Sequence, residues 1–340
     1  MNRLFAIALI TVTAAACNQS SGDDNVVNIY SARHYDSDAY VYDAFTAETG
    51  IEVNLIEAGG DLLIERIRTD GERSPADVVI TVDASRLQRA EEAGLFAQTD
   101  FSALADGVQA HVIDPDGYWA GFALRTRVIA YNRETVDPSE ISSYLDLADP
   151  RWQGQICIRS SDNAYNQSLL ASIIAHHGEQ AGEAWARSVV ANFARAPQGG
   201  DTDQIRAIGA GECDIAVVNH YYYLRLAHSG DPATVELTDR IGLIFPSGNT
   251  GTHVNISGVG IAANAPHGEN AEAFVRFLFS PEAQRAYAEI ANEFPAVTGA
   301  AYDNADLRAF DGFEADTLNI SELGDNAETA RRVFDRVGWP

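Results

Sequence analysis

The stretch around which the chain is organised is Val218-Asn219-His220-Tyr221-Tyr222-Tyr223-Leu224-Arg225. It continues the apolar run 214–218, which predicts a short buried strand, so three phenols follow the end of that strand. Adjacent side chains on an extended chain point to opposite sides, and neighbouring phenols therefore reach one ligand only where the backbone turns, as at the start of a helix. Two interpretations stand here: the tyrosines cap a core strand, or their oxygens hold a hard, highly charged cation.

Length and composition indicate a globular protein of two domains. The 340 residues are enough for two domains with a core each, and 46% of them are hydrophobic. There are 49 acidic residues against 23 basic ones, all of which are arginines, for a net charge of -26. Such a surface excludes nucleic acid and anionic lipid headgroups as partners, since both need basic patches. It favours a cationic ligand, although an acidic, salt-adapted proteome explains the same balance.

The first 25 residues predict an export signal and a tether. A short positive start and an apolar run from Leu4 to Ala16 are typical of a signal peptide, here 1–16, and are too short to span a bilayer. Small residues before Cys17 match a bacterial lipoprotein cleavage box, although a leucine is more usual where Ala14 stands. Ordinary cleavage after Ala16 would leave an odd exposed thiol, so we expect Cys17 to be lipidated and 17–25 to form the tether.

The two remaining cysteines, Cys157 and Cys213, predict a disulfide. An exported protein folds in an oxidising compartment, where an even pair of cysteines is usually bridged; two buried free thiols are the alternative. Cys157 precedes Tyr165 by eight residues and Cys213 precedes Tyr221 by eight. A bridge would therefore tie two tyrosine-bearing segments together.

The mature chain alternates short apolar runs with amphipathic stretches. Strands at 26–31, 52–56 and 77–82, with helices at 38–49 and 61–70 between them, predict a mainly parallel sheet covered by helices. Ligands of such sheets bind at the carboxyl ends of strands, and His34 and Tyr35 directly follow the first strand.

A second α/β pattern begins after a long apolar strand at 124–131, which we expect to cross into a second lobe with Arg125 near the hinge. Ser161 or Asp162 is the expected cap of the helix that contains Tyr165. A strand at 241–246 is expected to cross back. The predicted fold is an α/β protein of two lobes, each a mainly parallel sheet flanked by helices, with the ranges 26–123 plus 247–300 and 124–246 plus 301–340.

Searches for catalytic motifs find none in the sequence. There is no Gly-x-Gly-x-x-Gly after a strand, no phosphate loop, no His-Glu-x-x-His and no Gly-x-Ser-x-Gly. We therefore expect a binding protein rather than an enzyme.

The tyrosines lie in stretches that match one known family in order along nearly the whole mature chain. These stretches are 30–35, 45–51, 74–78, 158–168, 219–226 and 251–258. With them the chain resembles bacterial periplasmic ferric-iron-binding proteins, the solute-binding components of iron ABC transporters, and in particular their tyrosine-rich branch. The resemblance implies a two-lobed periplasmic-binding-protein-like fold of the class II type.

The resemblance also implies a set of metal ligands, namely His34, Tyr35, Tyr165, Tyr221 and Tyr222. Arg125 and Arg225 match arginines that lie behind the ligands. Val82 stands where another branch of the family has a glutamate that ligates together with a bound anion, which favours a site made of protein donors alone. Tyr223 matches no ligand and is expected to pack in the core.

The chemistry of phenols agrees with this implication. A free phenol has a pKa of about 10 and becomes a ligand at neutral pH only because a strong Lewis acid displaces its proton. Four phenolates around a trivalent ion carry one net negative charge, which a buried arginine can neutralise. Hard oxygen donors also select ferric over ferrous iron, so reduction is a route of release.

The implied protein is a monomeric clamp in the periplasm, anchored to a membrane by its N-terminal lipid, with hinges near Arg125 and Phe245. It would carry Fe(3+) as a transported ligand to the permease and ATPase of an iron uptake system. An organic cation such as a polyamine or thiamine, held by cation–π contacts, is the alternative ligand. An iron-tyrosinate enzyme would need open coordination positions, which five protein donors do not leave.

Overall fold

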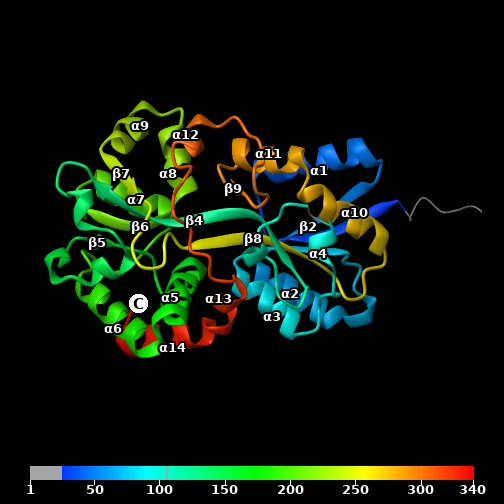
Figure 1. The fold of residues 1–340 in the computed structure, drawn as a ribbon, viewed down its shortest axis with the longest axis horizontal. Coiled ribbons are helices and arrows are strands. Elements are labelled where there is room, and N and C mark those ends of the chain that lie inside the picture. Colours follow the sequence, from blue (N-terminus) through cyan, green and yellow to red (C-terminus); the bar gives the residue numbers. More distant parts are fainter. Residues whose placement is uncertain (1–24, 105) are drawn as a thin grey trace, which may run out of the picture.

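The computed structural model describes residues 25–104 and 106–340 and shows a mixed sheet that runs through both halves of the molecule (Figure 1). The predicted signal peptide and Cys17 lie outside the described residues. The strands, in spatial order, are β2 (Glu52–Glu57), β1 (Val26–Ser31), β3 (Val78–Val82), β8 (Val254–Ile261), β4 (Ala120–Asn132), β6 (Ile215–Asn219) and β5 (Ile156–Cys157). Off this path, β7 (Ile241–Ile244) and β9 (Phe294–Pro295) pair with β4.

The first half has helices on both faces of its sheet because strand side chains alternate. Ile29 of β1 packs with Phe45 and Phe274, whereas its neighbour Tyr30 packs on the other face with Leu63 and Leu87. The helices of this half are α1 (Asp36–Thr49), α2 (Gly60–Asp70), α3 (Ala84–Glu92), α4 (Phe101–Leu104), α10 (Gly268–Leu278) and α11 (Pro281–Ile290). Short 3-10 turns are η1 (Gly71–Arg73) and η2 (Ala110–Val112).

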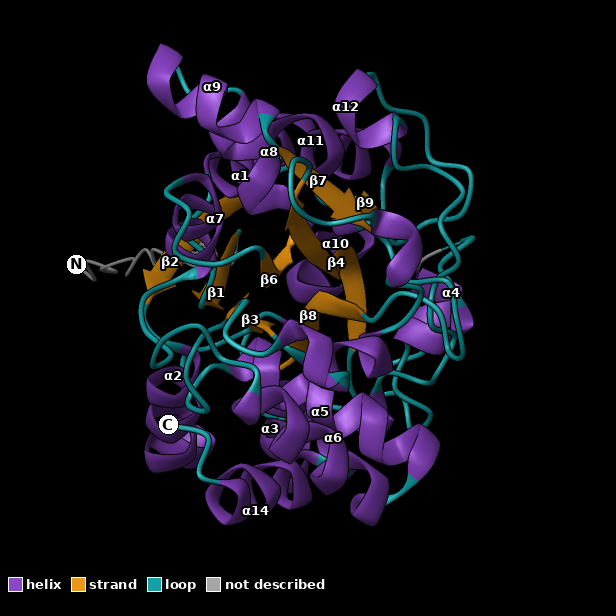
Figure 2. Cartoon of the chain, turned by 90° about the vertical axis from the view of Figure 1, so that its left-hand side faces the viewer, coloured by secondary structure: helices purple, strands orange, loops and turns teal. Residues whose placement is uncertain are grey.

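The second half repeats this plan around β5, β6 and β7. Its helices lie above and below the strands (Figure 2) and are α5 (Ala164–His177), α6 (Glu179–Ala191), α7 (Asp201–Gly209), α8 (His220–Ala227), α9 (Pro232–Asp239) and α14 (Ala327–Val337). The 3-10 turns here are η3 (Pro138–Glu140), η4 (Tyr144–Ala148) and η5 (Pro150–Trp152). The short helices α12 (Ala305–Arg308) and α13 (Ser321–Asp325) lie in the segment that runs from the first half to α14.

β4 crosses between the halves, as predicted for 124–131. Its residues 120–126 pair with β8, and 127–131 pair with β6. The chain leaves along β4 and returns along β8, so both run antiparallel to their neighbours, while β1–β2, β1–β3 and β5–β6 are parallel. The predicted two-lobed α/β class is confirmed, and the sheet is mixed because these connecting strands form its centre.

The return crossing differs from the prediction of a strand at 241–246. β7 ends at Ile244 and stays paired with β4. Pro246 has no N–H for a strand ladder, and Asn249 and Gly251 have φ of 61° and 84°, so the chain turns here. The Thr252 hydroxyl donates to the Pro246 carbonyl at 2.9 Å and closes the turn, after which β8 makes the crossing.

Two helices also begin at other residues than predicted. α5 is capped by Asn163, whose Oδ1 accepts from the Asn166 N–H at 3.2 Å, and not by Ser161 or Asp162. α1 begins at Asp36, and the residue before it, Tyr35, has extended dihedrals. Tyr35 is thereby fixed at the junction of loop and helix.

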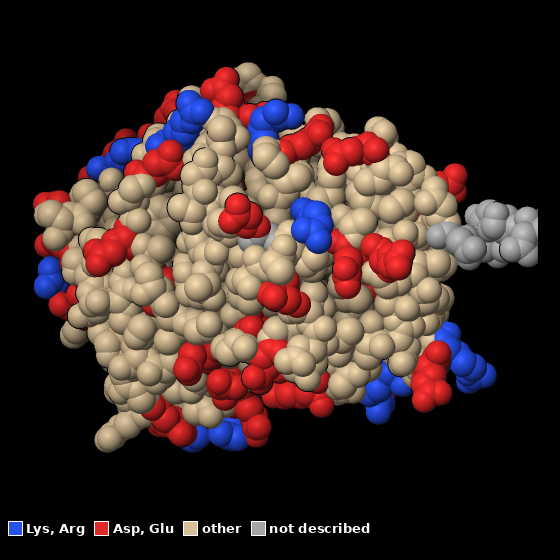
Figure 3. All heavy atoms as spheres, turned by 45° about the vertical axis from the view of Figure 1, so that its right-hand side comes forward, with Lys and Arg blue, Asp and Glu red and all other residues tan. Residues whose placement is uncertain are grey.

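One face of the molecule, seen in Figure 3, has acidic side chains gathered along its lower part, whereas its arginines are scattered singly and lie mostly towards the edges of the view. This agrees with the excess of acidic residues in the sequence. Among the helices that the structure describes, none is both long and apolar enough to cross a membrane.

We predict that His253, which is buried just before β8, makes the protein less stable in mild acid. Burial lowers the pKa of His253 to about 4 from 6.5, against the opposing pull of Asp316 and Asp83. Below pH 6.5 the imidazole of His253 is therefore protonated in the unfolded state but stays neutral in the folded state. The free energy of unfolding falls by up to about 3 kcal/mol as the pH falls to 4.

The measurement is urea unfolding of the metal-free protein between pH 7.5 and 4.5. His253→Gln should lose less stability over this range than the wild type, whereas the same change at the exposed His177 should not. A His253→Gln slope equal to that of the wild type would refute the assignment.

Candidate metal centre

Each of four tyrosines lies at the start of a helix. Tyr35 directly precedes α1, Tyr165 is in the first turn of α5, and Tyr221 and Tyr222 are in the first turn of α8. β6 ends at Asn219, so the backbone turns where the sequence predicted. The turn brings the rings of Tyr221 and Tyr222 to a centroid distance of 4.4 Å.

The four phenols converge although they come from three distant segments. The hydroxyls of Tyr165 and Tyr221 are 3.5 Å apart, and the rings of Tyr35 and Tyr221 are 6.4 Å apart, edge to face. Tyr221 is fully buried and Tyr165 nearly so, while Tyr35 and Tyr222 are half-buried. A hollow of about 320 Å³, lined by Tyr165, Tyr222 and Arg159 among others, opens beside them.

His34 is not brought to this cluster. Its side chain is 57% exposed, and its Nδ1 lies 3.3 Å from Oε1 of Glu57. The structure thus unites the four predicted tyrosines, and the role of His34 as a ligand stays a prediction. Tyr223 points to the core, where its hydroxyl is 3.4 Å from the carbonyls of Thr238 and Ile241, in agreement with its expected packing role.

The two predicted arginines both contact the phenols. Arg125 is buried and its Nη1 donates to the Tyr165 hydroxyl at 3.2 Å. The Arg225 guanidinium lies 4.8 Å from the ring centroid of Tyr35 and 5.1 Å from that of Tyr221. Arg225 therefore joins a tyrosine of the first half to those of the second.

Further arginines of the site were not predicted as such. Arg33 lies over the Tyr35 ring at 4.7 Å, and Arg127 and Arg159 lie 5.8 and 5.9 Å from the ring of Tyr165. Arg127 donates to Oδ2 of the buried Asp201 at 2.7 Å. One signal was available for Arg127, because it follows Arg125 by two residues in a strand and so faces the same side.

Burial favours the protonated form of Tyr221 and Tyr222 in the metal-free protein. It raises the pKa of Tyr222 to about 12, with Tyr165 nearby adding to the effect. Burial and the neighbouring Tyr165 also raise the pKa of Tyr221 far above the usual value, more than Arg125 lowers it. Only a strong Lewis acid would displace both protons at neutral pH.

The donor set at the tyrosines suits a hard cation. Among residues 25–104 and 106–340 there is no group of three or more His, Cys, Asp or Glu side chains placed to hold a metal ion. The converging donors are therefore phenol oxygens, which match a hard, highly charged ion.

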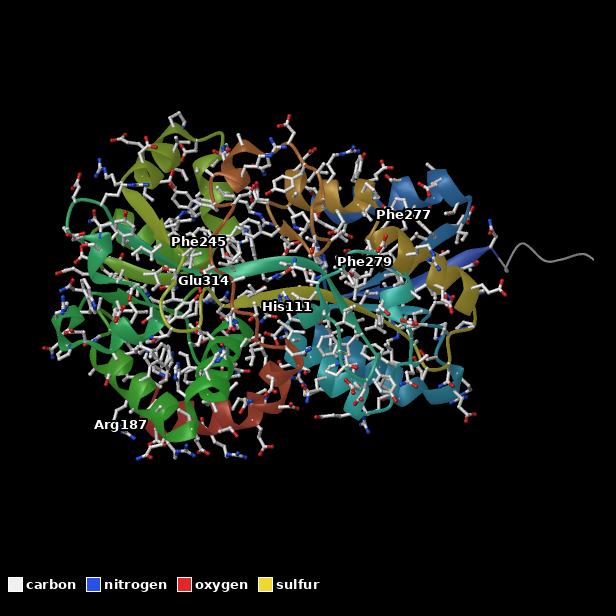
Figure 4. All side chains as sticks on the ribbon, viewed as in Figure 1. His111, Arg187, Phe245, Phe277, Phe279 and Glu314 are labelled. Atoms are coloured by element: carbon white, nitrogen blue, oxygen red, sulfur yellow. A yellow bond between two sulfur atoms is a disulfide. The ribbon has the colours of Figure 1, made fainter. Side chains whose placement is uncertain are left out.

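Larger hollows lie away from the phenols. One, of about 790 Å³, is lined by Phe277, Phe279 and Arg276, and the two phenylalanines lie in the first half (Figure 4). A second, of about 390 Å³, includes His111 near the middle of the molecule. Neither contains any of the four tyrosines, so the size of a hollow does not locate this site.

The predicted disulfide between Cys157 and Cys213 is present, with a Cα–Cα distance of 5.9 Å. It joins the end of β5, which leads to Tyr165, to the residues before β6, which leads to Tyr221. The bridge therefore fixes the two strands that deliver these phenols.

Residues 73–310 match the model of the family described as bacterial extracellular solute-binding proteins. The chain belongs to this family. Its relatives include iron uptake proteins A1 and A2 of Synechocystis sp., at 44% identity over 98% of this chain and 95% of A1, and at 46% identity over 96% of this chain and 94% of A2.

Among solved structures, Trichodesmium FutA (IdiA) in complex with iron and citrate is similar to this solute-binding protein. The TM-score is 0.89 and the identity 48%, over 93% of this chain and 100% of that one. These comparisons confirm the predicted resemblance to ferric-iron-binding proteins, and a family of solute-binding proteins agrees with the expectation of binding rather than catalysis.

We predict that loss of the Cys157–Cys213 bridge lowers the free energy of unfolding by about 4 kcal/mol, because the bridge closes a loop with a sequence separation of 56 residues. The measurement is urea unfolding of the Cys157→Ser/Cys213→Ser variant. As a control, dithiothreitol should destabilise the wild type to the level of this variant and leave the variant unchanged. Equal stability of both proteins would show that the bridge contributes nothing.

Proposed function

We propose that this protein binds ferric iron between its lobes and delivers it to a membrane transporter. The observation that carries the proposal is the convergence of four phenols among arginines, with the Tyr165 and Tyr221 hydroxyls 3.5 Å apart. Such a cluster suits four phenolates around a trivalent ion, whose single negative charge the arginines neutralise. The relatives named as iron uptake proteins support the same ligand.

The proposed iron ligands are Tyr35, Tyr165, Tyr221 and Tyr222. His34 is the fifth candidate, and its imidazole would have to leave Glu57 to join them. Val82, where the other branch has a glutamate, is apolar and offers no donor.

The proposed mechanism is a clamp. Tyr165, Tyr221 and Tyr222 belong to one lobe, proposed as 124–246 plus 301–340, and would receive iron first. Tyr35 belongs to the other, proposed as 26–123 plus 247–300, and would close over it. The hinges would lie near Arg125 in β4 and near Phe245, which directly follows β7 in the second half (Figure 4).

The proposed partners are the permease and ATPase of an iron ABC transporter. We place the protein in the periplasm as a monomer, held at a membrane by lipid on Cys17. Several acyl chains, as on bacterial lipoproteins, are enough for stable anchoring.

The arginines disfavour an organic cation as the ligand. A polyamine or thiamine would need free aromatic faces and nearby carboxylates. Here Arg33 and Arg225 lie over Tyr35, and Arg127 and Arg159 lie near Tyr165, so the faces are taken by like charges. An anionic ferric-phenolate complex is stabilised by the same arginines.

The proposal predicts a visible phenolate-to-iron charge-transfer band when ferric citrate is added to the metal-free protein. Tyr222→Phe should weaken or shift this band and lower the ferric affinity by at least about 100-fold. A side chain that binds the iron directly should contribute no less to the affinity than a residue that only hydrogen-bonds to a ligand, whose loss already costs up to about 100-fold. Tyr223→Phe is the matched control, because the adjacent phenol packs in the core. A colourless wild type would remove the iron assignment and favour an organic cation.

We further predict that binding releases about one proton per phenol ligand, because a phenol must lose its proton to ligate and burial raises the pKa of Tyr221 and Tyr222. For each proton released, the apparent ferric affinity should then fall by about tenfold for every unit by which the pH is lowered. Titration of the same ferric chelate between pH 6 and 8 should give a slope about one unit smaller for Tyr222→Phe than for the wild type. Equal slopes would contradict Tyr222 as a phenolate ligand.

A further inference from the structure

A buried carboxylate, Glu293, bridges two buried arginines behind the phenols. Arg33 Nη1 donates to Glu293 Oε2 at 2.9 Å, and Arg125 Nη2 donates to Glu293 Oε1 at 2.5 Å. The Ser257 hydroxyl contacts both guanidiniums. All three charged side chains are at most 1% exposed.

The bridge connects the tyrosines of both lobes. On one side, Arg33 donates to Asp38 Oδ1 at 2.9 Å, and Asp38 accepts from the Tyr35 N–H at 3.2 Å. On the other side, Arg125 reaches the Tyr165 hydroxyl at 3.2 Å. A single chain of charge-assisted hydrogen bonds thus runs from the backbone of Tyr35 to the hydroxyl of Tyr165.

Glu293 is held in place by its surroundings. Its N–H donates to the Tyr287 carbonyl at 3.1 Å, and the carbonyl of the preceding Asn292 lies 2.7 Å from Nε2 of His220. Burial alone would raise the pKa of Glu293, but the Arg33 and Arg125 guanidiniums lower it below the usual value. The carboxylate is therefore ionised at neutral pH and supplies a fixed negative charge.

The buried charges around the phenols balance one by one. The arginines Arg33, Arg125 and Arg127 face the carboxylates Asp38, Glu293 and Asp201. The less buried Arg86, Arg159 and Arg225 add positive charge without a buried carboxylate of their own, since Asp61, the partner of Arg86, is exposed and Asp201 already pairs with Arg127. The shell thus has a small excess of positive charge.

The iron charge decides how this balance acts. With four phenolates, a ferric complex has a net charge of minus one and a ferrous complex of minus two. A slightly positive shell is enough to balance the ferric complex. Any added positive charge stabilises the ferrous complex more than the ferric one, because the Coulomb interaction between the shell and the complex scales with the charge of the complex.

From this charge balance, and resting on the proposed function, we propose that Glu293 is a specificity-determining residue that keeps the site selective for ferric over ferrous iron. It does so by neutralising one of the two arginines that it joins, and it touches neither the iron nor the phenols. Without the negative charge of Glu293, the buried guanidiniums of Arg33 and Arg125 would have one carboxylate fewer to balance them, and the shell around the phenols would become more positive.

The test is Glu293→Gln, a change of charge with little change of shape. The ratio of ferric to ferrous affinity should fall by about 10–100-fold, the usual effect of an outer partner of a metal site. This ratio follows from the reduction potential of the iron-loaded protein, which should rise. A purely structural role would weaken both affinities alike and leave the potential unchanged, and that outcome would overturn the proposal.

Three further variants complete the test. Glu91→Gln is the matched control, because this carboxylate accepts from Trp119 Nε1 at 2.8 Å in the same lobe, away from the arginines of the site; it should leave the potential at the wild-type value. Arg33→Met/Glu293→Gln removes one charge of each sign and should bring the potential back towards the wild type. The double variant also tests the proposal if Glu293→Gln alone does not fold. If its reduction potential differs from that of the wild type as much as the potential of Arg33→Met alone does, the charge of Glu293 has no effect and the proposal is overturned.

The outcome separates this inference from the proposed function. A wild type without a ferric charge-transfer band would mean that the proposed function fails. A normal band in the wild type, with an unchanged potential in Glu293→Gln, would mean that only the role of Glu293 fails.

Discussion

Crowding of phenols is the constraint on which the site depends. Tyr165 and Tyr221 are buried and place their hydroxyls 3.5 Å apart, so two phenolates there would repel each other strongly. The empty protein avoids this repulsion by keeping the phenols protonated, since burial raises the pKa of Tyr221 and Tyr222. In the proposed function a trivalent ion among the oxygens removes this repulsion, and the fold supplies the arginines behind them in advance.

β4 links this electrostatic requirement to the architecture. Arg125 pairs with Asn255 of β8, on the side of the first lobe, and Arg127 pairs with Asn219 of β6, on the side of the second. The two arginines are two residues apart and so face the same side of the strand, at the point where it changes partner. The strand that connects the lobes therefore also carries the positive charge, and a change of angle between the lobes would move arginines and phenols together.

The elements that local pattern determines could be predicted from the sequence, and the contacts between distant segments could not. Apolar runs predicted the strands, and the phenols after the 214–218 run were placed correctly at a turn into a helix. The cap of α5 was missed because three neighbouring polar residues, Ser161, Asp162 and Asn163, all suit a cap and only the helix start distinguishes them. Glu293 carried no local signal, since its partners Arg33 and Arg125 lie 260 and 168 residues away in the sequence.

The buried ion pairs explain how a protein of net charge -26 can hold a basic cleft. A guanidinium without a partner is costly to bury, so each of Arg33, Arg125 and Arg127 is paired with a buried carboxylate. Pairing alone would leave the cleft without net positive charge. The half-exposed Arg159 and the exposed Arg225 add the remaining positive charge at the rim, where solvation is cheap and where the charge still reaches the rings of Tyr165 and Tyr35. The paired arginines thus supply fixed donors beside the phenols, and the arginines at the rim supply the net positive charge.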